Sequence, residues 1–193
     1  MPPLILASTS PFRAELLTRL GLPFSTFAPD IDETPLPGET PIDMVTRLTR
    51  AKAAAAIDAF PQHLIIASDQ CAICDQEILG KPGNHERAIA QLSRFSGKRI
   101  TFLTGLCLLN SQTGRVQIDC VPFHVHFRLL KTGQIDRYLH AEKPYNCAGS
   151  FKSEGLGITL FQKMEGDDPN ALVGLPLIRL TDFLASENIH LPL

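Results

Sequence analysis

The feature of this chain that most constrains its fold is a short apolar segment that runs directly into a polar loop and a helix start. Residues 4–7 are apolar, residues 8–10 are Ser, Thr and Ser, and Pro11 follows. Ser is favoured at the N-cap of a helix, and Pro is favoured in its first turn. We therefore predict a strand over Leu4–Ala7 and a helix over Pro11–Leu20.

The start of this helix is also a candidate phosphate site. Unpaired N–H groups and the positive end of the helix dipole attract anions to such a position. Arg13 lies in the first turn, where acidic residues are the usual choice, and this indicates an anionic partner. From this segment alone two interpretations are open, a phosphate site that includes Ser10 and Arg13, or an ordinary strand-to-helix connection with a solvated Arg13.

The rest of the chain alternates predicted strands and helices. The segments Ile100–Leu109 and Val116–Phe127 form a long antiparallel hairpin around the turn at 110–114. This hairpin favours a mixed twisted sheet flanked by helices in an α/β fold over a purely parallel sheet. The other predicted elements are strands at 24–27, 64–68 and 157–162, a short hairpin near 75–76, and helices at 41–60, 84–95, 132–141 and 176–186.

Length and charge limit the classes of function. A chain of 193 residues can form one sizeable core or two lobes, and since no repeat or linker interrupts it we expect one domain over residues 1–193. A net charge of −2 gives no basic field for nucleic acid, so local cations must bind any anionic substrate. No apolar run approaches the length of a membrane span, and the first residues lack the pattern of a secretory signal. We therefore expect a cytoplasmic protein without a membrane or nucleic-acid partner.

The five cysteines include one C-x-x-C pair, Cys71 and Cys74. Such a pair can indicate zinc or redox chemistry, but here no second pair and no suitably spaced His pair completes a zinc site. The segment also resembles a strand, in which positions three apart point to opposite faces. We interpret both cysteines as structural.

Four charged residues are candidates for chemistry, each with a simpler alternative. Asp69 follows the apolar strand 64–68, where it either caps a turn or faces a ligand. Lys52 falls on the apolar stripe of the helix at 41–60, from which it either extends to solvent or points into a site. Glu33 lies in an acidic loop and Lys81 lies between Gly80 and Pro82, and each is a solvated charge in its simpler interpretation.

Short motifs along the whole chain carry a family resemblance. After the opening segment come Asp32-Glu33-Thr34, Ser68-Asp69-Gln70 with Gly80-Lys81-Pro82, and Val173-Gly174-Leu175-Pro176. Each motif is weak alone, but their order and spacing are specific, and together they resemble the Maf family of nucleoside-triphosphate pyrophosphatases. The resemblance implies a Maf/inosine-triphosphatase-like fold, with a long twisted sheet and two lobes around a deep cleft, and it implies a homodimer.

The resemblance also implies roles for the charged residues. Asp69 matches the proposed general base of the family, and Glu33 together with Asp69 matches the ligands of a divalent cation, Mg²⁺ or Mn²⁺. Arg13, Lys52 and Lys81 then bind the triphosphate, with Ser10 at the helix start.

Three further residues make the chain most similar to the branch of the family that acts on 7-methyl-GTP. Phe12 is aromatic where other branches carry a basic residue, although Trp is common in the 7-methyl-GTP branch itself. An aromatic ring favours the cationic 7-methylguanine base by roughly 0.5–2 kcal/mol. Glu154 can accept hydrogen bonds from guanine where pyrimidine-selective members carry Gln, and Gln70 replaces a common Thr or Ser.

The sequence therefore predicts hydrolysis of 7-methyl-GTP to 7-methyl-GMP and pyrophosphate, which would remove modified nucleotides. Two alternatives are open at this point. One is a dTTP and UTP pyrophosphatase of the same mechanism, against which residues 12, 70 and 154 argue. The other is a nucleotide-binding regulator of cell division without turnover, against which an intact Asp69 argues, because a pure binder needs no base.

Overall fold

The chain folds around one mixed β-sheet whose residues belong to two compact units. The computed structural model describes residues 1–192. Unit 1 comprises residues 1–69, 104–121 and those from 168 onward, and unit 2 comprises residues 70–103 and 122–167. The strands are β1 (Leu4–Ala7), β2 (Phe24–Phe27), β3 (Leu64–Cys74), β4 (Glu77–Leu79), β5 (Arg99–Asn110), β6 (Val116–Phe127) and β7 (Phe161–Glu165).

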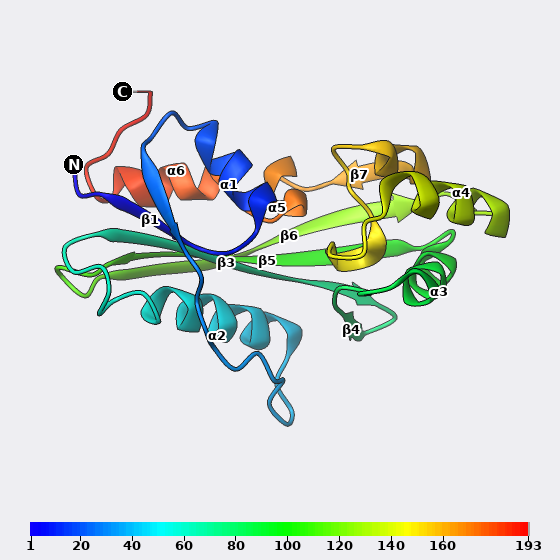
Figure 1. Ribbon diagram of the computed structural model, residues 1–193, viewed down its shortest axis with the longest axis horizontal. Coiled ribbons are helices and arrows are strands. Elements are labelled where there is room, and N and C mark those ends of the chain that lie inside the picture. Colours follow the sequence, from blue (N-terminus) through cyan, green and yellow to red (C-terminus); the bar gives the residue numbers. More distant parts are fainter. Residues whose placement is uncertain (193) are drawn as a thin grey trace. The chain divides into compact units, whose positions relative to one another are not determined.

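The sheet has seven strands in the order β2-β1-β3-β5-β6-β7, with β4 paired to β3. β1 pairs in parallel with both β2 and β3, whereas the β3–β4 and β6–β7 pairs are antiparallel. The predicted mixed sheet flanked by helices is confirmed (Figure 1), while the cleft between lobes stays a prediction. The helices are α1 (Pro11–Thr18), α2 (Pro41–Ala54), α3 (His85–Phe95), α4 (Thr132–Glu142), α5 (Pro169–Val173) and α6 (Leu177–Ala185), with 3₁₀ turns η1 (Ala148–Ser150) and η2 (Leu156–Leu160).

In unit 1, alternate side chains of β1, β3 and β5 enter two separate apolar clusters. Leu6 and Ile66 pack with residues of α1 and α6, whereas Ile5 and Ile65 pack on the opposite face near α2. This is the period of two expected of a strand that is buried on both faces. In Figure 1, α1 and α6 accordingly lie on one side of these strands and α2 on the other. β1 and the first part of β3 are therefore packed between α1 and α6 on one face and α2 on the other.

A glycine lets α2 lie close against β5. A Cβ atom at Gly105 would stand 2.2 Å from the Oγ1 atom of Thr49 and 2.8 Å from a methyl carbon of Val45. Both distances are shorter than van der Waals contact allows, so a larger residue at 105 would push α2 away. The position of α2 matters because this helix carries Lys52.

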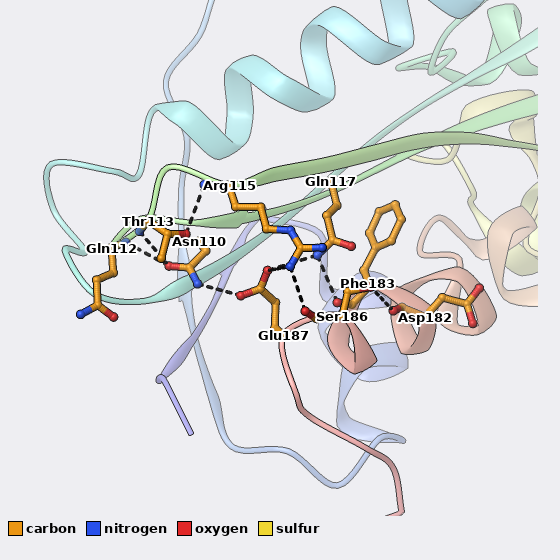
Figure 2. A network of polar contacts seen from close by, with 9 residues as sticks. All are labelled: Asn110, Gln112, Thr113, Arg115, Gln117, Asp182, Phe183, Ser186 and Glu187. Carbon is orange, nitrogen blue, oxygen red and sulfur yellow. Dashed lines mark hydrogen bonds and ion pairs between the residues drawn. The ribbon is translucent and has the colours of Figure 1, made fainter.

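The end of α6 is fastened to the β5–β6 turn by polar contacts (Figure 2). The Glu187 carboxylate accepts a hydrogen bond from Asn110 Nδ2 at 2.7 Å and pairs with the Arg115 guanidinium at 3.4 Å. Arg115 also donates to the backbone oxygen of Ser186 at 2.9 Å, and Gln117 donates to that of Phe183 at 3.1 Å. The carbonyls that a helix end leaves unpaired are thus satisfied by side chains of the hairpin.

Unit 2 has its own core of aromatic rings. Phe127 lies within 5.2–5.7 Å of three neighbouring rings, measured between ring centroids. Edge-to-face pairs of this kind add roughly 0.5–1.5 kcal/mol each to the apolar burial. The cluster consists of Phe95, Phe102, Phe127, Phe151 and Phe161.

Three predicted elements differ from the structure, and one helix was not predicted. The strand predicted at 64–68 continues to Cys74 because its later residues pair with β4. The helix predicted to reach residue 60 ends at Ala54. After it, backbone hydrogen bonds join residues three apart, as in a 3₁₀ turn, and Pro61 follows. Residues 156–160 form a 3₁₀ turn instead of a strand, and α5 was not predicted at all.

Close packing of the backbone explains the 3₁₀ turn η2, and an N-cap followed by Pro marks the start of α5. A Cβ at Gly157 would stand 2.2 Å from the backbone oxygen of Lys152, so the backbone is folded tightly there. Asp168 followed by Pro169 is an N-cap with Pro in the first turn, which was enough to predict α5. In residues 1–192, the structure contains no helix long and apolar enough to cross a membrane.

Candidate active site

The candidate site lies in unit 1, where the parallel pairing of β1 with β3 stops. Ala7, the last residue of β1, is opposite Ala67 in the register of the two strands. Beyond this point β3 continues past the end of β1 with Ser68 and Asp69, while the chain leaves β1 through Ser8 toward α1. Ligands in α/β sheets bind beyond the carboxyl ends of parallel strands, and this is such an end. Asp69 therefore lies two residues beyond the last pair with β1 and inside β3, and does not end the strand as the sequence suggested.

Asp69, Lys52 and Glu33 converge on one point. The Lys52 ammonium nitrogen lies 2.6 Å from Asp69 Oδ1 and 2.7 Å from Glu33 Oε1. The side chains of Lys52 and Asp69 are 10% and 12% exposed, whereas that of Glu33 is 60% exposed. Lys52 thus points into the site and does not extend to solvent, which settles one alternative left by the sequence. The two carboxylates balance the positive charge of the buried ammonium, which would otherwise be costly to bury.

Arg13 is held on the other side of β3 by backbone and hydroxyl groups. Its Nε donates to the backbone oxygen of Gly174 at 2.8 Å, and the Ser68 hydroxyl donates to the same oxygen at 2.8 Å. One Nη atom donates to Ser8 Oγ at 3.4 Å. Burial lowers the pKa of Arg13, while the negative charges of Asp69 and Glu33 raise it. Arg13 is therefore fixed close enough to both carboxylates to interact with them electrostatically.

The predicted helix start has the expected geometry. Ser10 is the N-cap of α1, and its hydroxyl accepts a hydrogen bond from the backbone N–H of Arg13 at 3.4 Å. The buried Ser8 hydroxyl accepts another from the N–H of Ser10 at 3.1 Å. Ser8 was missed by the sequence analysis, although it stands in the same Ser-Thr-Ser run.

Gly174 explains the Val-Gly-Leu-Pro motif. Its φ of +124° lies in a region that side-chain-bearing residues rarely adopt, and a Cβ there would stand 3.3 Å from Arg13 Nε. The loop is fastened on both sides by Asp168, whose carboxylate accepts from the backbone N–H groups of Asn170 at 2.9 Å and Ile178 at 2.8 Å. The motif therefore presents one carbonyl oxygen to Arg13 and Ser68.

If Arg13 binds phosphate, as the family resemblance implies, Gly174→Ala should weaken nucleotide binding. The strained backbone should cost about 1–3 kcal/mol of stability, and the displaced guanidinium should raise KM more than it lowers kcat. Gly114→Ala is the matched control, because Gly114 has a φ of +73° but no atom within 4 Å of the added Cβ. Equal KM values for the two variants, measured by pyrophosphate release, would contradict the role given to Gly174.

The acidic loop that carries Glu33 is fastened to α2 by Arg47, a second residue that the sequence analysis missed. Arg47 binds both carboxylate oxygens of Glu39, at 2.6 and 2.8 Å, and donates to the backbone oxygen of Thr34 at 3.2 Å. A bidentate contact of this kind pairs the charges and also fixes the relative orientation of the two side chains. The Asp32 carboxylate accepts a hydrogen bond from the backbone N–H of Thr34 at 2.9 Å, which forms a turn within the loop. Arg47 and Lys52 thus hold neighbouring parts of the loop from one helix.

The Asp69–Glu33 pair fits the chemistry of a divalent cation. Both carboxylates direct an oxygen at the same ammonium nitrogen, so their oxygens already converge on one positive charge. Hard divalent cations prefer carboxylate oxygens and need few protein ligands when phosphate and water supply the others. Glu33 and Asp69 are therefore the residues that would hold such an ion.

The remaining predicted residues are Phe12, Gln70, Lys81 and Glu154. Phe12 is half-buried on α1 in unit 1. Gln70 follows Asp69 on β3, where successive side chains point to opposite faces. Lys81 is exposed in the loop between β4 and α3, and Glu154 is exposed before η2, where it accepts from the Ser153 hydroxyl at 3.3 Å. Gln70, Lys81 and Glu154 belong to unit 2, so their roles stay predictions.

The C-x-x-C pair has the environment of structural cysteines. Cys71 and Cys74 are buried on β3. Burial raises the pKa of the Cys74 thiol, and a raised pKa reduces the thiolate that redox and metal chemistry require.

Comparison with known proteins agrees with this geometry. Residues 3–187 match the Maf family, described as a Maf-like protein. Proteins named 7-methyl-GTP pyrophosphatase are 59% identical in Pseudomonas syringae pv. tomato, with 100% of both chains covered, and 60% identical in Alcanivorax borkumensis, with 100% of this chain and 98% of the relative covered. The Ham1 protein of Staphylococcus aureus shares the fold, with a TM-score of 0.54 and 12% identity over 96% of this chain and 99% of that one. The chain therefore belongs to the Maf family.

Proposed function

We propose that this protein hydrolyses 7-methyl-GTP to 7-methyl-GMP and pyrophosphate. The observation that carries the proposal is full-length identity of 56–60% to relatives named 7-methyl-GTP pyrophosphatase. The site in unit 1 is consistent with it, because a buried carboxylate, an ammonium and a guanidinium meet at the end of β1. Hydrolysis of a phosphoanhydride requires such groups, a base for water and cations for the phosphates.

In the proposed reaction, Asp69 orients a water molecule toward the α-phosphorus and accepts its proton. Arg13 presents its guanidinium to the phosphates while Gly174 holds its Nε. Lys52 exchanges part of its contact with the carboxylates for contact with phosphate oxygens, which frees Asp69 Oδ1 for water. Lys81 and the N-cap Ser10 complete the set of phosphate ligands that the sequence predicts.

A divalent ion, when bound by Glu33 and Asp69, supplies charge neutralisation for the triphosphate and the leaving pyrophosphate. We expect EDTA to abolish turnover and an excess of Mg²⁺ or Mn²⁺ to restore it. Pyrophosphate release before and after the addition of each ion measures this effect. Undiminished turnover in EDTA would remove the ion from the mechanism and leave Glu33 as a partner of Lys52 only.

The substrate is tested with a panel of nucleotides. We expect kcat/KM for 7-methyl-GTP to exceed the values for GTP, dTTP and UTP when pyrophosphate is the measured product. A preference for dTTP or UTP would assign the protein to the pyrimidine-selective alternative. Nucleotide binding without any turnover would favour the regulator instead and contradict the proposal.

Phe12 and Glu154 are proposed to contact the base. Glu154→Gln removes the charge that complements the cationic base and one acceptor for guanine, so kcat/KM for 7-methyl-GTP should fall about ten- to a hundredfold. Phe12→Ala should lower the preference for 7-methyl-GTP over GTP, because only the methylated base carries the charge that favours the ring.

Glu86→Gln is the matched control for Glu154→Gln, since Glu86 is an exposed carboxylate of the same unit on α3. It should leave all four kcat/KM values unchanged. If neither the Glu154 nor the Phe12 variant alters the ranking of nucleotides, these two residues do not determine specificity, although the hydrolysis itself would stand.

A further inference from the structure

Unit 2 contains a second cluster of chemically capable side chains that the proposed hydrolysis does not use. His85 lies in the first turn of α3, and Asp136 and His140 lie one turn apart on α4. One ring nitrogen of each histidine and one carboxylate oxygen of Asp136 lie within 4.8 Å of one another. Two imidazoles and a carboxylate are ligands that divalent transition metals share.

His85 has a polar partner at each ring nitrogen. Nδ1 lies 2.9 Å from the Tyr145 hydroxyl oxygen, and that hydroxyl donates to the backbone oxygen of Leu139 at 3.4 Å. Nε2 lies 3.3 Å from Asp136 Oδ1. With the ring proton on Nδ1, the lone pair of Nε2 and the carboxylate oxygen face each other, and one metal ion can bind both.

The cluster is held in place by its surroundings. The backbone N–H of Gly83 donates to the backbone oxygen of Tyr145 at 2.9 Å, which fixes the tyrosine beside the start of α3. His140 Nδ1 lies 3.4 Å from Asp136 Oδ1 and 2.9 Å from the backbone oxygen of Asp136. The two imidazole rings are 4.8 Å apart between centroids. All three candidate ligands are thus already gathered from two helices.

We propose that His85, Asp136 and His140 bind a late first-row divalent transition metal ion, with Zn²⁺ as its representative, and that the ion joins α3 to α4. Ligand atoms at about 2.0–2.1 Å from a tetrahedral ion are about 3.3 Å apart, which matches the 3.3 Å between His85 Nε2 and Asp136 Oδ1. His140 Nδ1 faces the backbone oxygen of Asp136 at 2.9 Å, so Nε2 is the metal ligand of that ring. Metal-binding histidines usually have a polar partner at the ring nitrogen that does not bind the metal, and His85 Nδ1 has the Tyr145 hydroxyl in that place at 2.9 Å. The His140 side chain is 69% exposed and leaves the site open to incoming ions and water.

The imidazole ligands separate this site from the carboxylate pair of unit 1. Mg²⁺ prefers oxygen ligands and retains its water, whereas Zn²⁺, Co²⁺ and Ni²⁺ accept imidazole readily. Excess Mg²⁺ should therefore leave Zn²⁺ bound in unit 2. The experiment below uses no nucleotide and no turnover, so its failure would leave the proposed hydrolysis unaffected.

The test is calorimetric titration of the full-length protein with Zn²⁺ in excess Mg²⁺, after removal of metal and chelator. We expect one equivalent to bind, and His85→Ala and His140→Ala each to weaken binding by at least about tenfold. His190→Ala is the matched control, because His190 is an exposed histidine of unit 1 and should bind Zn²⁺ like the wild type. The visible spectrum of bound Co²⁺ should change in the two cluster variants and stay unchanged in the control.

Two results would overturn the proposal. If the folded wild type, verified by circular dichroism, binds no Zn²⁺, then His85, Asp136 and His140 are joined by hydrogen bonds alone and do not form a metal site. If both cluster variants bind Zn²⁺ as tightly as the wild type, the ion occupies another place, such as the Cys71–Cys74 pair, and the proposed ligands are wrong. A variant that fails to fold is replaced by His85→Gln, which keeps polar contact without an imidazole.

Discussion

Asp69→Asn is expected to lower kcat by about 10²–10⁴-fold, the range that loss of a general base produces. The amide retains the size of the side chain but cannot accept a proton from water. Lys52 keeps Glu33 as a partner at 2.7 Å, so the site should stay folded and nucleotide binding should change far less than turnover. Single-turnover kinetics with 7-methyl-GTP, together with a direct binding titration, separate the two effects.

Asp58→Asn is the matched control for this variant. Asp58 is an exposed carboxylate of unit 1, in the turns that follow α2, and its amide variant should have the turnover of the wild type. Turnover of Asp69→Asn close to that of the wild type would exclude Asp69 from proton transfer. Loss of binding equal to the loss of turnover would instead give Asp69 a role in holding substrate.

Lys52→Met should reduce both stability and activity. Removing one partner from a buried ion pair leaves an uncompensated charge and typically costs about 3–5 kcal/mol, and here that charge is Asp69. For a chain of this size each kcal/mol lowers Tm by about 2–4 °C, so thermal unfolding should shift by at least about 6 °C. In addition, kcat/KM should fall about ten- to a hundredfold, because a charged contact to phosphate is lost.

Two variants control the interpretation of Lys52→Met. Lys98→Met removes an exposed lysine that pairs with Asp75 at 2.6 Å, and its stability should change by less than about 1 kcal/mol. The double variant Lys52→Met with Asp69→Asn should recover part of the lost stability, because the unpaired carboxylate is gone. If Lys52→Met unfolds at the temperature of the wild type, the ion pair does not stabilise the fold.

The outline of the fold could be predicted because its local signals agree with its packing. Ser10 and Pro11 mark the start of α1. The continuous apolar run of β1 is typical of a strand buried on both faces, and its residues enter the two clusters of unit 1 alternately. The turn at Asp75 and Gln76 also follows from local sequence, and both residues have positive φ. Where the prediction was wrong, at residues 156–160, the conformation depends on the close approach of Gly157 to the backbone oxygen of Lys152, which apolar periodicity does not reveal.

The candidate site could be predicted only in part, because its partners are distant in the chain. The position of Lys52 on an apolar stripe left its direction open, and only the family resemblance placed it in the site. No local pattern shows that its ammonium joins Asp69 to Glu33. The role of Gly174 depends on Arg13, which lies 161 residues earlier. The roles of Gln70, Lys81 and Glu154, the single domain and the homodimer stay predictions.

The most direct test of the account is hydrolysis of 7-methyl-GTP in ¹⁸O-water, followed by mass spectrometry of both products. If Asp69 orients water toward the α-phosphorus, the label appears in 7-methyl-GMP and the released pyrophosphate is unlabelled. Label in the pyrophosphate, or orthophosphate as the first product, would show that water attacks a different phosphorus and would contradict the proposed arrangement of Asp69, Lys52 and Arg13.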